Sequence, residues 1–364
     1  MLAIQHLQIE FGARVIFSDL SFAVLPKERI AFAGHNGAGK STLMKCIAGM
    51  LVPNSGAIVK PKYCDIGYLP QEGIHIKGIS LWDEVESAFA ETRDLQIKID
   101  QLSEKLHDLD PRSAPYSDLL HDIGDLELKL EAASPGTIKP KMESVLTGLG
   151  FKRTDFTRDC GEFSGGWQMR IALAKLLLVQ PQVLLLDEPT NHLDAESVHW
   201  LEQHLQSYKG TVIAVTHDRY FLDNVAGWIL ELDRGEGIPF KGNYSSWLEQ
   251  KTKRLAQEEK TESKRRKALE RELEWVRQGP KGRQSKGKAR LNNYEAMMSE
   301  SIKEKESKIE IPIPNGPRLG NEVIEAVNIS KAYDNKLLYD DLNFKLPPAG
   351  IVGIIGPNGA GKTT

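Results

Sequence analysis

Two segments of the sequence have the spacing of a phosphate-binding loop. The first runs from Gly34 to Ser41 and the second from Gly356 to Thr363, and both read Gly-x-x-x-x-Gly-Lys followed by Ser or Thr. Glycines in such a loop let the backbone curl so that successive N–H groups point inward, and the lysine adds a positive charge for the outer phosphates. We therefore predict two phosphate-binding loops, the first with Lys40 bridging the outer phosphates and Ser41 as a ligand of Mg²⁺.

Two apolar runs end in residues that suit phosphate chemistry. One run leads into Asp187 and Glu188, and the other leads into His217. Such runs are typical of parallel strands buried on both faces, whose functional residues emerge at the carboxyl edge of the sheet. We expect Asp187 to hold Mg²⁺ through its water shell, Glu188 to polarise an attacking water, and His217 to contact the γ-phosphate. An isolated histidine at such a position is more often structural, but the neighbouring motifs favour the functional role.

A serine and two glycines precede an apolar-faced helical pattern. Ser164 is the predicted N-cap of this helix, and Gly165 and Gly166 follow it. Such residues serve in an ordinary helix cap, but they also form an anion site at a helix N-terminus. Because Ser164 lies 23 positions before Asp187, we favour the anion site.

These motifs require an α/β domain in which strand, loop and helix follow one another. Each phosphate loop follows a short apolar run, residues 30–33 or 351–355, and a helical pattern follows the first loop. Shifting the sequence by 322 positions places Phe11 on Tyr333 without a gap, so the loops belong to a longer internal repeat. After the second lysine only Thr363 and Thr364 follow. We therefore expect a piece of a longer protein with two such domains, and little intrinsic activity from the piece alone.

The composition is that of an ordinary globular chain. It has 364 residues, of which 40% are hydrophobic and 27% charged, a formal net charge of -3, and no apolar run as long as a membrane span. The first residues lack the basic and apolar regions of a secretory leader, and the three cysteines have no metal-ligand spacing. These features predict a cytoplasmic protein with no membrane partner. The near-neutral average argues against a protein devoted to nucleic acid.

The segment at about residues 81–140 is acidic and exceeds what a minimal domain of this kind needs. Apolar residues recur there at helical spacing on both sides of a break at Pro111–Pro115, which predicts a helical pair. Between Trp82 and Pro135 there are 14 acidic and 5 basic residues. A solvated helical face accounts for this acidity as well as a protein contact does.

The segment at residues 246–310 links the repeats and is basic. From Lys251 to Glu310 it has 18 basic and 11 acidic residues, with few apolar positions in two predicted helical arms. Arms of mixed charge are typical of a soluble spacer. The tip between them has cations and glycines but no acid, which favours contact with the phosphates of structured RNA. The predicted RNA-binding residues are Lys281, Arg283, Lys286, Lys288 and Arg290.

Taken together, these motifs resemble the ATP-binding cassette ATPases. The segments that carry the resemblance are the two phosphate loops, Gln71 in Tyr68-Leu-Pro-Gln, Ser164-Gly-Gly, Val183–Glu188, Asn191–Asp194 and His217. The resemblance implies that Gln71 senses Mg²⁺ and the γ-phosphate, and that ATP lies between the phosphate loop of one domain and the Ser-Gly-Gly signature of the other. The usual signature is Leu-Ser-Gly-Gly-Gln, whereas Phe163 and Trp167 stand at its ends here.

The resemblance also implies a set of site residues. Phe11 and Tyr333 would stack on the adenines. The nucleotide-binding set is Phe11, Gly34, His35, Asn36, Gly37, Ala38, Gly39, Lys40, Ser41, Thr42, Ser164, Gly165, Gly166, Tyr333, Gly356, Pro357, Asn358, Gly359, Ala360, Gly361, Lys362, Thr363 and Thr364. The implied catalytic residues are Glu188, His217, Gln71 and Lys40, and the implied Mg²⁺ ligands are Ser41, Gln71 and Asp187.

A basic hairpin joining two cassettes resembles the ABC-F family, whose members act on the ribosome. This narrower resemblance rests on Asp218–Gly237, Glu274–Gln278 and Lys281–Arg290. It implies a first cassette at 1–245 with a helical arm at about 81–140, a linker at 246–310 and the start of a second cassette at 320–364. The implied linker contact is P-site tRNA, and the arm would reach toward the L1 stalk. The implied partners are thus rRNA and tRNA but no DNA, with a monomer at full length.

We therefore interpret the protein as an ATP-hydrolysing, ribosome-associated translation factor that uses ATP and Mg²⁺. It would bind near the E site and regulate elongation according to the energy state. One alternative is the nucleotide-binding subunit of an ABC transporter, in which the basic tip would have no role. A second alternative is an ABC-F protein that protects ribosomes from antibiotics.

Overall fold

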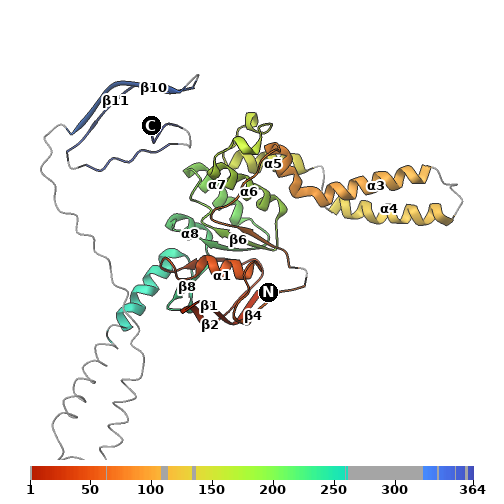
Figure 1. Ribbon diagram of the computed structural model, residues 1–364, viewed down its shortest axis with the longest axis horizontal. Coiled ribbons are helices and arrows are strands. Elements are labelled where there is room, and N and C mark those ends of the chain that lie inside the picture. Colours follow the sequence, from red (N-terminus) through yellow and green to blue (C-terminus); the bar gives the residue numbers. More distant parts are fainter. Residues whose placement is uncertain are drawn as a thin grey trace, which may run out of the picture. The chain divides into compact units, whose positions relative to one another are not determined.

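The computed structural model describes residues 2–62, 64–107, 114–132, 137–258, 260, 323–333, 336–348, 350–356 and 360–364. The chain divides into two units, whose long continuous parts are Met1–Trp247 and Leu248–Ile355. The strands of the first unit are β1 (Leu2–Phe11), β2 (Arg14–Val24), β3 (Arg29–Ala33), β4 (Ser55–Val59), β5 (Ile66–Leu69), β6 (Val183–Asp187), β7 (Thr211–Val215), β8 (Trp228–Asp233) and β9 (Glu236–Lys241). Its helices are α1 (Lys40–Ile47), α2 (Leu81–Glu86), α3 (Ala90–His107), α4 (Ala114–Ala132), α5 (Ile138–Gly148), α6 (Gly165–Val179), α7 (Ala195–Gln206) and α8 (Arg219–Val225), and Figure 1 shows their arrangement.

A six-stranded sheet forms the centre of the first unit. Its order is β5-β6-β7-β3-β8-β9, with parallel pairing throughout except between β8 and β9. Because β5, β6, β7, β3 and β8 run in one direction, the residues that follow each of them gather at one edge. A second sheet, antiparallel and ordered β2-β1-β4, belongs to the same unit. The predicted α/β class with a parallel sheet is confirmed.

Side chains of the apolar strands pack in two hydrophobic clusters, one on each face of the sheet, because successive residues of a strand point to opposite faces. Leu184 and Leu186 of β6 pack with α6 and α7 in one cluster. Val183 and Leu185 pack with α1 and with β1 and β2 in the other. All five residues of β6 are buried, as the apolar run predicted.

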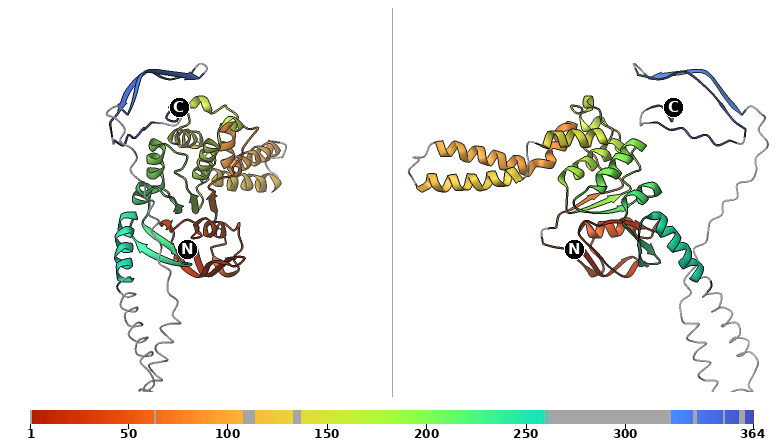
Figure 2. Two further views of the ribbon diagram at one scale, coloured as in Figure 1. Left: turned by 60° about the vertical axis from the view of Figure 1, so that its left-hand side comes forward. Right: turned by 180° about the vertical axis from the view of Figure 1, so that it is seen from behind.

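Helices α3 and α4 form a hairpin that projects from the rest of the first unit (Figures 1 and 2). They occupy the acidic segment, where the apolar spacing predicted a helical pair. Ile99 and Ile123 are buried, one from each helix, with exposed fractions of 5% and 6%. Part of the predicted break, at residues 111–113, lies outside the described residues.

The second unit contains an antiparallel hairpin of β10 (Ile324–Tyr333) and β11 (Lys336–Leu346). Every residue pair in this hairpin lies 322 positions after a pair in the β1–β2 hairpin. The apolar run at 351–355 forms no strand, unlike its counterpart at 30–33. Strand β3 is paired on both sides, by β7 and β8, and the described residues after 355 supply no such strands.

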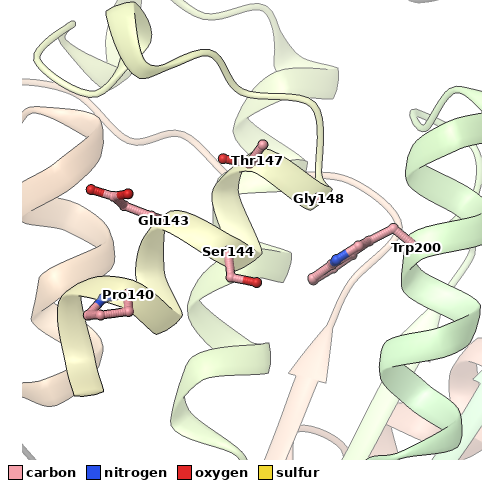
Figure 3. A pocket seen from close by; sticks show the side chains of 6 residues that line it. All are labelled: Pro140, Glu143, Ser144, Thr147, Gly148 and Trp200. Atoms are coloured by element: carbon pink, nitrogen blue, oxygen red, sulfur yellow. The ribbon is translucent and has the colours of Figure 1, made fainter.

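Helix α5 meets α7 where the Trp200 ring lies against Gly148, the last residue of α5 (Figure 3). A shallow pocket of about 470 Å³ opens beside this contact. It is lined by Pro140, Glu143, Ser144, Thr147, Gly148 and Trp200, none of which is a predicted site residue. The contact therefore serves to pack the two helices.

Alanine at two helical glycines is expected to have opposite effects. A methyl group at Gly148 would overlap the Trp200 ring, whereas nothing lies within 4 Å of one at Gly124 in α4. Gly148→Ala should lower the free energy of unfolding by about 1–3 kcal/mol through overpacking. Gly124→Ala should raise it by about 0.5–1 kcal/mol, because alanine loses less backbone entropy in a helix. Urea unfolding of both variants measures the difference, and equal shifts of one sign would contradict it.

Candidate functional site

The first phosphate loop joins β3 to α1, and its glycines adopt backbone angles that other residues rarely accept. Gly37 has φ 82° and Gly39 has φ 94°. A Cβ at Gly39 would also collide with Ile16 and with the Phe17 ring, 2.7 Å away. Glycine at position 39 is therefore required twice, by backbone conformation and by packing against β2.

The Lys40 ammonium lies within the curl of this loop. Its Nζ donates to the carbonyl oxygens of Gly34 at 2.8 Å and His35 at 3.1 Å. Burial lowers the pKa of Lys40, while the charges of Glu188 and Asp187 act in the opposite direction. The loop and the end of β6 thus share one electrostatic environment.

The β1–β2 hairpin reaches the same loop through its tip. Phe11 pairs with Arg14 across the hairpin, and the Arg14 guanidinium donates to the carbonyl oxygen of Gly37 at 3.1 Å. The Phe11 side chain is exposed, as expected of a residue that stacks on a base. The structure therefore brings Phe11 close to the phosphate loop.

The ends of β6 and β7 bring the predicted carboxylates and histidine together. Asp187 is paired with Val215, and the Glu188 N–H donates to the Val215 carbonyl oxygen at 2.8 Å. Glu188 has φ 53°, in the left-handed region that is uncommon for a residue with a side chain. Such strained residues are frequent at functional sites.

Glu188 is buried, with an exposed fraction of 9%, and its carboxylate faces His217. His217 Nε2 lies 3.6 Å from Glu188 Oε1, and the His217 backbone N–H donates to Glu188 Oε2 at 3.4 Å. Burial raises the pKa of Glu188, and the His217 and Thr216 contacts offset part of this rise. A carboxylate with a raised pKa accepts a proton from water more readily than an exposed one does.

Asp187 is the most buried acid of this edge, with an exposed fraction of 2%. The Tyr68 hydroxyl donates to its Oδ2 at 3.4 Å, but its Oδ1 has no hydrogen-bond partner. A buried carboxylate oxygen without a donor suits a hydrated cation. Burial raises the pKa of Tyr68, and the charge of Asp187 and the hydrogen bond to it act in the same direction.

Gln71 follows β5, the strand beside β6, and is exposed at the same edge. Ser41 stands in the first turn of α1, directly after Lys40. No group of three His, Cys, Asp or Glu side chains with metal-site geometry occurs in the described part of the chain. Ser41, Gln71 and Asp187 all carry side-chain oxygens, and the Oδ1 atom of Asp187 has no hydrogen-bond partner. Such oxygens fit Mg²⁺, which is usually held by a few protein oxygens together with nucleotide phosphates.

The Ser164 segment occupies a different part of the domain. Ser164 is the N-cap residue of α6, as predicted, but its hydroxyl makes no capping hydrogen bond. Phe163 and Met169 belong to the cluster on one face of the sheet, whereas Leu43 and Met44 of α1 belong to the cluster on the other. The exposed Ser164 and Gly165 are thus presented away from the first phosphate loop.

The aromatic residues at the ends of this segment have packing roles. The Phe163 and Trp167 rings contact Phe151, with centroids at 5.8 and 4.9 Å. The guanidinium of Arg158 lies over Phe163, and that of Arg170 lies over Trp167. The departure from the usual signature therefore fills an aromatic cluster and leaves the serine and glycines accessible.

Two polar residues of α6 were not predicted from the sequence. Gln168 is buried and donates to the Cys160 and Phe163 carbonyl oxygens at 3.1 and 3.3 Å, while it accepts from the Ile76 N–H at 3.2 Å. Arg170 is also buried, and it donates to the His192 and Leu149 carbonyl oxygens. The sequence pattern around Gln168 and Arg170 does not predict these contacts, because Ile76 lies 92 positions from Gln168, and Leu149 and His192 lie 21 and 22 positions from Arg170.

The predicted residues of the second loop are only partly described. Gly361 has φ 93°, close to that of Gly39, and Tyr333 is exposed with Lys331 Nζ 4.7 Å from its ring centroid. Pro357, Asn358 and Gly359 lie outside the described residues. The five predicted RNA-binding residues between 281 and 290 also lie outside the described residues, as do the two linker arms from residue 261 onward.

Among the described helices, none is both long and apolar enough to cross a bilayer.

Comparisons with known proteins show which sequences and folds the chain is similar to. Two family models, both described as ABC transporter, match residues 17–191 and 230–312. A structure of the ATP-binding subunit of an ABC transporter superimposes with a TM-score of 0.50 and 18% identity, over 66% of this chain and 90% of that one. At this identity the superposition shows the fold alone.

Curated relatives are much more similar in sequence. The energy-dependent translational throttle protein EttA of Escherichia coli K12 is 48% identical over 351 residues, which cover 96% of this chain and 62% of that protein. EttA of Mycobacterium tuberculosis H37Rv is 46% identical over 97% of this chain and 62% of its own length. The ATP-binding protein ChvD of Rhizobium radiobacter is 51% identical over 67% of this chain and 80% of its length. The chain thus spans less than two thirds of the EttA proteins.

Glu188→Gln is expected to stabilise the fold at neutral pH. Because the pKa of Glu188 is raised in the folded state, its neutral form favours folding. That stability is present below the ordinary value of 4.5 and is lost as the pH rises through the raised pKa. The gain from Glu188→Gln should therefore be largest near pH 7 and shrink below pH 4.5, as measured by urea unfolding. The exposed Glu196→Gln is the control, and a gain that does not change with pH would contradict the prediction.

Proposed function

Because the chain belongs to the ABC-F family of ATP-binding cassette proteins, we propose that it is part of an ATP-hydrolysing translation factor that acts on the ribosome. The observation that carries the ATPase proposal is the buried Glu188 carboxylate, held against His217 at the edge where Asp187 and Lys40 also lie. The similarity to EttA over 96% of the chain supports the ribosomal role.

In the proposed reaction, the backbone N–H groups of the first loop and Lys40 bind the ATP phosphates. Bound Mg²⁺, with Ser41, Gln71 and Asp187 as its protein ligands or water partners, would neutralise phosphate charge. Glu188 accepts a proton from the attacking water, and His217 holds the carboxylate in place and contacts the γ-phosphate. Phe11 stacks on the adenine. The Ser164 segment faces outward and serves the ATP of a second cassette, so residues 1–364 alone would turn over ATP slowly.

On the ribosome, the basic tip at Lys281–Arg290 binds RNA phosphates and P-site tRNA, and the α3–α4 hairpin reaches toward the L1 stalk from the E site. ATP closes two cassettes on each other and hydrolysis opens them, so that the energy state decides whether the factor holds or releases the ribosome. The protein acts in the cytoplasm as a monomer at full length.

Glu188→Gln in the full-length protein should lower the rate of ATP hydrolysis by about 100-fold or more, because the general base is lost. It should also hold the ATP-bound, closed form on ribosomes and stall translation in vitro. Steady-state phosphate release and a translation assay measure the two effects. Glu196→Gln on the exposed face of α7 is the matched control, and normal turnover by the Glu188 variant would exclude the mechanism.

The full-length protein should sediment with ribosomes in ATP at low salt and lose this association at high salt, because phosphate contacts release counterions. Replacing Lys281, Arg283, Lys286, Lys288 and Arg290 with glutamine should weaken binding most at low salt. The same number of exposed lysines changed within the first cassette is the control. Association with membranes and none with ribosomes would favour the transporter alternative.

A further inference from the structure

Helix α8 follows the sheet edge that carries Asp187, Glu188 and His217, which we call the catalytic edge, and it contacts the start of the linker segment. It starts immediately after His217, with Asp218 as its N-cap accepting from the Tyr220 and Phe221 N–H groups at 3.0 and 3.1 Å. Phe221 is fully buried in the cluster that also contains Trp247. The start of α8 is therefore tied to the segment that follows β7, in which the Asp218 N–H donates to the Thr216 hydroxyl at 3.1 Å.

The far end of α8 is bonded to the helix at 244–258, which begins the linker segment. Asp223 Oδ1 accepts from the Ser245 N–H and Asp223 Oδ2 accepts from the Ser245 hydroxyl, both at 2.7 Å. Asn243 caps the same helix, accepting from the Ser246 N–H at 3.2 Å, and its side chain donates to the Asp223 carbonyl oxygen. A carboxylate at a helix N-terminus also interacts favourably with the helix dipole.

A second contact joins the same two helices one turn earlier in α8. The guanidinium of Arg219 lies 6.0 Å from the centroid of the Tyr244 ring, and Tyr244 packs on Trp247 at 5.0 Å. Residues 219 and 223 are four apart and so share one face of α8. The helix at 244–258 is thus held by one face of α8 at two points.

From this geometry we propose that Asp223 is a positioning residue that couples the nucleotide at the catalytic edge to the orientation of the linker helix at 244–258. The inference rests on the proposed function, since it requires ATP to bind beside His217. A shift of His217 on ATP binding or release moves the start of α8, and the Asp223–Ser245 bonds carry the shift to the linker. The segment Asp218–Gly237, which carries part of the family resemblance, contains both Arg219 and Asp223.

A purely stabilising role would not need these bonds, because Asn243 already caps the helix from its own segment. Asp223 adds a bond between elements 22 positions apart in sequence. Asp223 touches no residue that we place in the ATP site. Its loss should therefore leave the basal chemistry intact and remove the communication with the linker.

The test compares backbone hydrogen exchange of residues 244–250 with and without ATP in the full-length protein carrying Glu188→Gln, which holds ATP. ATP should change the exchange rates there by roughly fivefold or more. Adding Asp223→Ala should abolish this response, and Ser245→Ala, which removes one of the two bonds, should reduce it. Glu196→Ala on α7 is the control and should leave the response unchanged.

In the full-length protein that retains Glu188, Asp223→Ala should keep the basal rate of ATP hydrolysis within about twofold of the rate without this substitution. An undiminished exchange response in Asp223→Ala, or a response absent from a parent that binds a fluorescent ATP analogue, would overturn the inference and leave the proposed function standing. A parent that binds no ATP overturns both. If Asp223→Ala does not fold, Ser245→Ala decides, and its full response would refute the coupling.

Discussion

The catalytic edge depends on the parallel register of β6 and β7. The two strands pair from Val183 with Thr211 to Asp187 with Val215, so that both chains leave the sheet at one level. Backbone bonds extend the ladder beyond each end, from Thr211 to Gln182 and from Glu188 to Val215. A slip of one residue would turn every side chain of a strand to the opposite face. The observed pairing of Asp187 with Val215 is therefore what places Glu188 beside His217.

The parts of the site that sequence predicts are those specified by neighbouring residues. The glycines of the phosphate loop are one example, since the positive φ of Gly39 and its close contact with β2 allow only glycine at this position. Apolar runs likewise predict β6 and β7, and their parallel pairing places Glu188 beside His217. The conformation of Glu188 itself is different. Its left-handed φ follows from how the chain turns after β6, and a glutamate in sequence gives no sign of it.

Long-range polar contacts escape sequence reasoning for a physical reason. Gln168 satisfies backbone groups at Ile76 and Cys160, and the first of these is 92 positions away. Arg170 does the same for Leu149 and His192. Buried amides and guanidinium groups are stable only when their donors are satisfied. Gln168 and Arg170 thus hold helix α6 to the loop after Gln71 and to the Asn191–Asp194 segment. No local sequence pattern predicts these contacts.

The β1–β2 and β10–β11 hairpins have repeated sequences and the same strand pairing, but they differ in burial. Their pairing is the same, and even the left-handed φ of 48° at His6 recurs at Asn328. Burial is not the same, because Leu7 and Leu20 are 0% and 1% exposed whereas Ile329 and Leu342 are 41% and 39% exposed. Strand pairing is determined within the hairpin, so the repeated sequence reproduces it. Burial of its apolar face requires elements such as α1 and β3 from elsewhere in a domain, and the first hairpin has them in one core cluster.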